Sequence, residues 1–229
     1  MLAPLPSFDT TSDETKRPVR RNLRASAADG AAFGGMVGVG ETYFAAFALA
    51  MGLGEVAAGL VASLPVMAGG IMQLVSLRAV RWVGSEKRWI LLCASLQALS
   101  FFPLVYAALT GAISSWALFL VASIYWGAGL ATGPAWSTWI ESVVPAGIRV
   151  RYFASRSRLA QLTTLAGFLL GGAALTVGRS LGEVPAAVGL RFFAAALLRL
   201  YSVSWLARHQ SLDRPETARR PTSRPVSTS

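Results

Sequence analysis

Charged residues are scarce in this sequence, and acidic ones are the scarcer of the two signs. Only 14% of the 229 residues are charged, whereas 54% are hydrophobic. A soluble domain usually carries about 25% charged residues, so the composition excludes an ordinary water-soluble fold. The net charge of +10 could suggest nucleic acid as a partner. The basic residues lie in short clusters between apolar runs, however, and not on one polar face, so we expect no nucleic-acid partner.

Cysteine and histidine occur once each, as Cys93 and His209. A single cysteine excludes an intrachain disulfide, and a single histidine near the C-terminus argues against a histidine-based metal site or catalytic triad. The sequence also lacks a P-loop, metal-ligand spacing and a serine nucleophile elbow. We therefore expect no enzyme activity, no cofactor and no metal.

Long apolar runs are what the sequence has in abundance. Each is near or above the about 20 residues that cross the hydrocarbon core of a bilayer. No strand-like alternation is present, and backbone groups in lipid must bond within their own segment, so helices are expected. The six runs cover residues 28–53, 56–77, 89–109, 115–143, 159–181 and 186–207. The sequence predicts an all-α, polytopic transmembrane bundle of six helices over 25–208, between disordered basic ends at 1–24 and 209–229.

Basic residues flank these runs asymmetrically. Of the 21 Lys and Arg residues, all but three lie before the first run, between the second and third, between the fourth and fifth, or after the sixth. The exceptions are Arg179, on the opposite side, and Arg191 and Arg199, inside the sixth run. The positive-inside rule then predicts a multi-pass protein of a bacterial inner (plasma) membrane, surrounded by lipid, with both termini cytoplasmic.

One acid interrupts the first apolar run. The stretch GVGETYFAAFALAMG, residues 38–52, contains the carboxylate of Glu41 and no cation. A charge near the bilayer midplane costs about 3 kcal/mol or more, so we expect Glu41 to face a cavity or a partner. Two interpretations stay open: a proton carrier or substrate contact, and a carboxyl that joins two helices. Tyr43 and Phe44 follow directly and are placed to line the same cavity.

The fourth run carries the stretch YWGAGLATGPAWSTWIES. Three of its glycines leave room for a neighbouring helix to approach: Gly127, Gly129 and Gly133. Pro134 is expected to bend the helix. Tyr125 and Trp136 fall near one face, which suits an aromatic-lined cavity. Trp136 also fits the aromatic belt at the membrane surface, and Trp139 fits that belt better than a cavity.

Two arginines lie within the sixth run. Arg191 is close enough to the end of the run to extend its head group outward. Arg199 is deeper and is expected to need a carboxylate or carbonyl partner.

Taken in order, these features resemble the N-terminal half of a major facilitator superfamily transporter. The resemblance covers residues 24–208 and rests on six helices with short outer loops, a basic loop after the second helix, and the stretch GPAWSTWIESVVPAGIRVRYFASRSR. The basic loop, QLVSLRAVRWVGSEKR, keeps Gly84, Lys87 and Arg88 of the family pattern Gly-x-x-x-Asp-Arg-x-Gly-Arg-Arg. Gln73 and Leu77 replace its first Gly and its Asp.

The fourth helix of proton-coupled antiporters in this family often has an Arg a few residues before a Gly-x-Gly. Here Gly127-x-Gly129 is present, but Ser123 stands at the Arg position. The resemblance therefore does not extend to proton antiport.

The resemblance implies a function and a set of site residues. In this family the first and fourth helices line a central cavity with the substrate site near the midplane. The residues that would contact substrate are Glu41, Tyr43, Tyr125 and Trp136, and those of a gating loop are Gly84, Lys87 and Arg88. The implied function is alternating-access transport of an unidentified small solute by a half-length or truncated form. Its partner would be a second copy or a second six-helix half. The alternative is a non-transporting six-helix scaffold or an inactive fragment.

Overall fold

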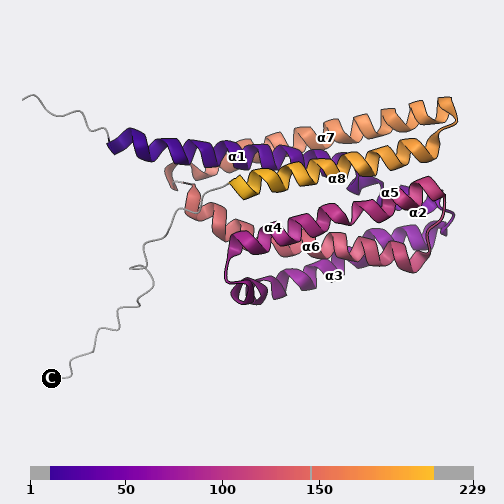
Figure 1. Ribbon diagram of the computed structural model, residues 1–229, viewed down its shortest axis with the longest axis horizontal. Helices are drawn as coiled ribbons and strands as arrows, with labels where there is room; N and C mark the ends of the chain where they lie inside the picture. The colour runs from indigo at the N-terminus through magenta and orange to yellow at the C-terminus, as the bar shows by residue number, and fades with distance from the viewer. Residues whose placement is uncertain (1–10, 145, 209–229) are drawn as a thin grey trace, which may run out of the picture.

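The computed structural model describes residues 11–144 and 146–208, and every regular element in this part is a helix (Figure 1). The elements are α1 (Thr11–Val39), η1 (Glu41–Tyr43), α2 (Phe44–Ala50), α3 (Gly54–Val83), α4 (Glu86–Leu99), α5 (Phe101–Thr110), α6 (Ser115–Val143), η2 (Ala146–Ile148), α7 (Arg149–Leu181) and α8 (Val184–Arg208). Here η denotes a short 3-10 helix. Together they make six segments long and apolar enough to cross a membrane. The predicted all-α fold with six spans is therefore confirmed.

The N-terminal segment differs from its prediction. Helix α1 begins at Thr11, so residues 11–24, predicted to be disordered, are helical. At the end of this stretch the helix packs into the bundle: Tyr152 of α7 donates a hydrogen bond of 3.1 Å to the carbonyl of Leu23, and Asn22 is buried. Residues 1–10 and the predicted disordered tail at 209–229 lie outside the described residues.

Two of the six spans are interrupted. The first runs through α1, the single turn of η1 and then α2, with Glu41 at the start of the interruption. The third consists of α4 and α5, which meet at Ser100. Pro103 accounts for the second interruption, since it has no amide hydrogen to donate to the carbonyl of Leu99, four residues earlier.

The spans pack in a pattern that repeats between the two halves of the chain. Helix α1 packs along α7 and α8, and α6 packs along α3 and α4. The first, second and third spans correspond to the fourth, fifth and sixth. Under this correspondence the pairings of α1 with α7 and α8 become those of α6 with α3 and α4, and the α5–α8 pairing is unchanged. Because each triplet has an odd number of spans, the two triplets run in opposite directions. Figure 1 shows the result as two layers, α1–α7–α8 and α3–α4–α6.

The closest helix contact joins α1 to α7. A Cβ atom on Gly34 or Gly38 would overlap the carbonyl oxygens of Ala160 and Thr164, so this small-x-x-x-small pattern lets the two backbones touch. Close packing was predicted for α6, where only one of the three glycines faces a tight contact. A Cβ on Gly129 would lie 2.5 Å from the side-chain nitrogen of Gln97, whereas the nearest neighbours of the other two are 3.6 Å or more away.

The connections that carry the basic residues gather at one end of the bundle. In Figure 1 the α3–α4 turn, the α6–α7 connection and the end of α8 all lie on the left, and the connections between the other spans lie on the right. The Lys87 ammonium donates a hydrogen bond of 2.8 Å to the carbonyl of Ala207 and so links the α3–α4 turn to the end of α8. We call this the basic end.

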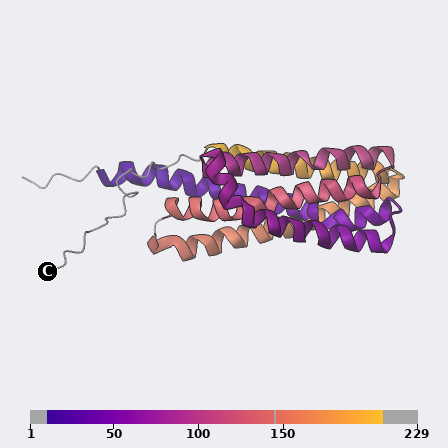
Figure 2. The ribbon, with the colours of Figure 1, turned by 90° about the horizontal axis from the view of Figure 1, so that it is seen from below.

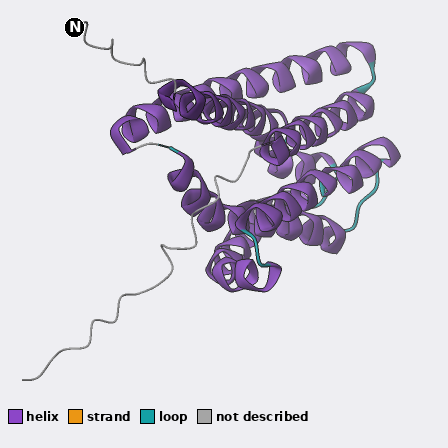
Figure 3. Ribbon diagram, turned by 60° about the vertical axis from the view of Figure 1, so that its left-hand side comes forward, coloured by secondary structure: helices purple, strands orange, loops and turns teal. Residues whose placement is uncertain are grey.

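The outward surface of the bundle is apolar. Large side chains along α3 and α7 are exposed, for example Ile71, Leu74, Leu165 and Leu170. Two exposed tryptophans mark the opposite ends of the bundle, Trp82 at the basic end of α3 (84% exposed) and Trp116 at the far end of α6 (85% exposed). Figures 2 and 3 show the spans as near-parallel rods joined by short loops. This is the surface of a multi-pass membrane protein.

Candidate functional site

Glu41 and Tyr125 meet in the middle of the bundle. Tyr125, from α6, is fully buried, and its hydroxyl donates a hydrogen bond of 2.5 Å to the Glu41 carboxyl. The same hydroxyl lies 3.1 Å from the sulfur of Met36. The contact therefore joins the first span to the fourth at the point where the first is interrupted. Broken helices at mid-membrane depth are typical of transporter sites, because the interruption brings polar groups into the bundle.

Phenylalanine rings surround the Tyr125 ring. Phe44 and Phe101 pack edge-on against it, with ring centroids 5.0 Å and 5.2 Å away. Phe192 packs against both phenylalanines, and all three are buried. These rings keep water from the Tyr125 side of the Glu41 contact, and a hydrogen bond gains strength in such a low-dielectric setting.

A buried amide lies on the same side of α6. Gln97, from α4, packs its side chain against Gly129, one turn after Tyr125. Among the residues that the structure describes, the Gln97 side-chain oxygen has no hydrogen-bond partner. Buried polar groups are normally paired, so this oxygen is a free acceptor next to the Glu41–Tyr125 contact.

Tyr43 faces a different helix. Its hydroxyl donates a hydrogen bond of 2.8 Å to the carbonyl of Phe168 in α7, and its ring stacks on the ring of Phe168. The guanidinium carbon of Arg191 lies 3.4 Å from the Tyr43 ring centroid, which is a cation–π contact. Arg191 is buried, so the prediction that it extends outward to the membrane surface is wrong.

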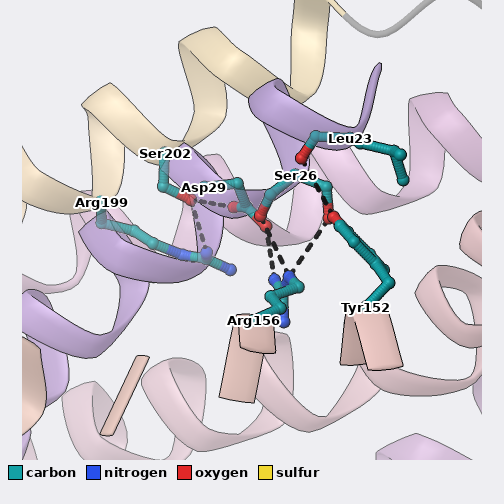
Figure 4. A network of polar contacts seen from close by, with 7 residues as sticks. All are labelled: Leu23, Ser26, Asp29, Tyr152, Arg156, Arg199 and Ser202. Carbon is teal, nitrogen blue, oxygen red and sulfur yellow. Dashed lines mark hydrogen bonds and ion pairs between the residues drawn. The ribbon is translucent and has the colours of Figure 1, made fainter. Parts of the chain in front are cut away.

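A second polar cluster lies nearer the basic end, between α1, α7 and α8 (Figure 4). Asp29 is at its centre. One carboxylate oxygen of Asp29 forms an ion pair of 2.9 Å with Arg156, and the other accepts a hydrogen bond of 2.6 Å from Ser202. Arg199 donates to the Ser202 hydroxyl at 2.9 Å, and Arg156 also donates to the carbonyl and hydroxyl of Ser26. The carboxylate expected for Arg199 is thus Asp29, reached through Ser202.

A cavity of about 210 Å³ opens beside this cluster. Its lining includes Asp29, Arg156, Arg199, Phe33, Thr132 and Trp136. The Arg156 guanidinium carbon lies 4.3 Å from the Trp136 ring centroid. Of the four predicted contact residues, the structure therefore brings Glu41 and Tyr125 together and places Tyr43 and Trp136 in separate surroundings.

Three residues of this second polar cluster were not singled out from the sequence: Asp29, Arg156 and Ser202. Asp29 is one residue inside the first apolar run, and Arg156 stood among the cations of a predicted loop. The available signal was Arg199 itself, because a deep arginine requires an acid at similar depth. Asp29 is the one acid besides Glu41 within the predicted runs 28–53 and 186–207.

The predicted gating loop is a tight turn at the basic end. Gly84 ends α3 in the left-handed conformation, with φ of 74°. Lys87 binds the carbonyl of Ala207 as described, and the backbone amide of Arg88 donates to the Ser85 side chain at 3.4 Å. The loop therefore contacts the end of α8.

Trp139 is buried instead of lying in an exposed aromatic belt. It is 6% exposed and packs with Ile90 and Leu206. The belt prediction for this residue is wrong, since α6 turns that face toward α4 and α8. Trp82 and Trp116 have the exposure that a belt requires.

Within residues 11–144 and 146–208, no group of three or more His, Cys, Asp or Glu side chains could hold a metal ion. No protein-family model matches the sequence, and no curated protein or solved structure shows significant similarity to it.

Proposed function

We propose that this chain forms one six-helix half of an alternating-access secondary transporter of the major facilitator type, which carries a small solute. The observation that carries the proposal is the repeated pairing of the two triplets, α1 with α7 and α8 and α6 with α3 and α4. Inverted repeats of three spans nested in a six-span half are the architecture of that family. The resemblance noted in the sequence favours the same assignment.

The position of Glu41 supports transport over a purely structural bundle. The Glu41 carboxyl lies at an interruption of the first span and is held by a buried tyrosine of the fourth. A carboxyl at this depth costs stability, and ionisable groups inside a membrane usually have a function. Substrate sites of secondary transporters lie near the bilayer midplane, at the interface between repeats. Glu41 and Tyr125 come from the first spans of the two triplets.

The basic end is proposed to face the cytoplasm. Clusters of Lys and Arg resist transfer across a bacterial inner membrane. Most cations of the described residues lie at this end, in the start of α1, the α3–α4 turn, the α6–α7 connection and the end of α8. In this orientation the Asp29 cavity lies toward the cytoplasm and Glu41 lies deeper.

A rocking mechanism requires two bundles facing one another across the site. The partner is a second six-helix half or a second copy of this chain. Two copies inserted in the same orientation reproduce the parallel relation between the two halves of a complete transporter. The contacts between the two triplets, such as those of Gly34 and Gly38 with α7, are tight enough for the bundle to move as one body.

Alternating access can be tested without knowledge of the solute. Thr132 lines the Asp29 cavity. Right-side-out and inside-out vesicles from the producing cell expose the two faces of the membrane separately. A Thr132→Cys variant in a Cys93→Ser background should react with a membrane-impermeant maleimide in both kinds of vesicle. Ser114→Cys is the control and should react from one side. Labelling of Thr132→Cys from one side alone would favour the non-transporting scaffold.

A further inference from the structure

The Asp29 cavity carries an excess of positive charge. Three charged side chains line it: Asp29, Arg156 and Arg199. Asp29 pairs directly with Arg156, so one carboxylate faces two guanidinium groups. Asp29 and Arg199 lie within the first and sixth apolar runs, where an uncompensated charge is costly, and Arg156 lies just before the fifth run.

Arg199 is the under-compensated group. It is 3% exposed, yet within the described part of the chain its guanidinium makes a single hydrogen bond, to Ser202. Its Nε is buried and has no hydrogen-bond partner in residues 11–144 and 146–208. The Arg199 guanidinium carbon also lies 4.9 Å from the centroid of the Phe33 ring, over its face. An arginine has five N–H donors in a planar fork, so most of the binding capacity of Arg199 is unused.

The neighbouring groups fix the two guanidinium groups in place. Arg156 is held by Asp29, by Ser26 and by the face of Trp136. Arg199 is held by Ser202 and Phe33. Two arginines that are ordered before a ligand arrives lose little conformational freedom on binding it.

We propose that this cavity binds one anionic group, a carboxylate or a phosphate, between Arg199 and Arg156. A single negative charge balances the excess in the cavity, and guanidinium groups bind such oxyanions through paired N–H donors. The volume, about 210 Å³, is below the about 300–1,000 Å³ of sites that enclose a whole drug-sized ligand. The cavity therefore holds the charged head of a molecule and leaves the remainder in the opening.

The source of the anionic group is either a free solute or the headgroup of an anionic lipid. In the first case the inference names the substrate class and rests on the proposed function: an organic anion or a phosphate ester. In the second case the cavity is a lipid site on a membrane protein. Both sources share the oxyanion that the two arginines recognise.

The test measures binding to the purified full chain in a neutral maltoside detergent, free of added lipid, at constant ionic strength. Sodium phosphate and sodium benzoate are titrated by calorimetry, with glucose as the uncharged control. Saturable binding of either anion supports a site for a free solute. Binding of phosphatidylglycerol micelles alone supports the same site with a lipid headgroup in it. Failure of phosphate, benzoate and phosphatidylglycerol to bind would overturn the proposal.

Matched variants locate the site. Arg199→Gln should weaken anion binding by about tenfold to a hundredfold, as the loss of a charged hydrogen-bond donor does. Arg158→Gln is the control, because Arg158 is an exposed arginine of α7 that does not line the cavity. Equal affinity in Arg199→Gln and the unmodified protein would overturn the assignment.

Asp29→Asn is an independent test, because it should change anion affinity in the opposite direction. It removes the one negative charge of the cavity while keeping a side chain of the same shape, so anion affinity should rise, and it should rise more for phosphate than for benzoate. This variant also covers the case in which Arg199→Gln fails to fold. Weaker anion binding in a folded Asp29→Asn protein would contradict the proposal. None of these measurements depends on transport, so their failure leaves the proposed transport function untouched.

Discussion

The hydroxyl of Tyr125 donates a 2.5 Å hydrogen bond to the Glu41 carboxyl, 84 positions earlier in the chain. One residue belongs to the first span of the first triplet and the other to the first span of the second triplet. Buried phenylalanine rings shield this hydrogen bond from water on the Tyr125 side. The contact joins the two repeats of the bundle at the one acid that interrupts an apolar run near its middle.

Removing the tyrosine hydroxyl should destabilise the bundle modestly. Tyr125→Phe leaves a partly buried carboxyl without its donor, and we expect the free energy of unfolding to fall by about 1–3 kcal/mol. Tyr106→Phe is the matched control, since Tyr106 is 69% exposed, and it should have no effect. The measurement is denaturation in detergent. A double-mutant cycle with Glu41→Gln should return a coupling energy above about 0.5 kcal/mol; additive effects would show that the two groups act independently.

Glu41→Gln should separate a functional carboxyl from a structural one. The amide can still accept a hydrogen bond from Tyr125, so insertion and folding should persist. Substrate binding or uptake by the assembled transporter should fall by at least about tenfold, since a charged hydrogen bond is stronger by about 1.4 kcal/mol or more. If Glu41→Gln and Glu41→Leu both behave as the unmodified protein, the carboxyl is dispensable and Glu41 is no site residue.

The contact between α1 and α7 predicts a position-dependent glycine effect. Gly38→Ala should destabilise the protein by about 1–3 kcal/mol, because its Cβ would overlap the carbonyl of Thr164 and overpacking costs that much. Gly59→Ala in α3 is the control, as a Cβ there has no atom within 4 Å, and it should be neutral or slightly stabilising. Thermal unfolding of the two variants in the same detergent measures the difference. Equal midpoints would mean that α1 and α7 are less close than described.

Orientation is tested by cysteine labelling. Ser114 precedes α6 at the end of the bundle opposite the basic end, and Ser157 lies in α7 near the basic end; both are exposed. In a Cys93→Ser background, Ser114→Cys should react with an impermeant maleimide added to intact cells, and Ser157→Cys only after the inner membrane is opened. Labelling of Ser157→Cys in intact cells would reverse the proposed orientation.

Hydropathy and charge were sufficient to predict the six spans and the clustering of cations at one end, because both follow from transfer free energies that the sequence carries directly. The Glu41–Tyr125 contact could be anticipated from the sequence for a similar reason. A single acid near the middle of a span needs a polar partner at the same depth, and Tyr125 is a polar residue near the middle of the fourth run.

The Asp29–Arg156 pair could not be predicted from the sequence, because it depends on where α7 begins. The predicted fifth run starts at residue 159, whereas the helix starts at Arg149. Arg and Ser do not break helices, so the basic segment continues the helix and carries Arg156 alongside α1. Hydropathy indicates which residues are stable in lipid, but it does not predict how far a helix extends beyond the membrane. The break at Ser100 was missed too, although Pro103 was a visible signal for it.

The isolated chain should not transport as a monomer. A single six-helix bundle provides one wall of the site, and its Glu41 would then face lipid or water on the side that Tyr125 leaves open. Pairing with a second copy or a second half removes that cost. The mass of the protein–detergent complex determines the oligomeric state, and uptake of a panel of organic anions, phosphate esters and neutral solutes into liposomes determines activity. A monodisperse dimer with saturable uptake would identify a functional half-transporter. Rapid degradation or aggregation would identify an unpaired fragment, and the same preparation made together with a second six-helix half should then be stable. A stable monomer that catalyses saturable uptake would contradict the requirement for two walls.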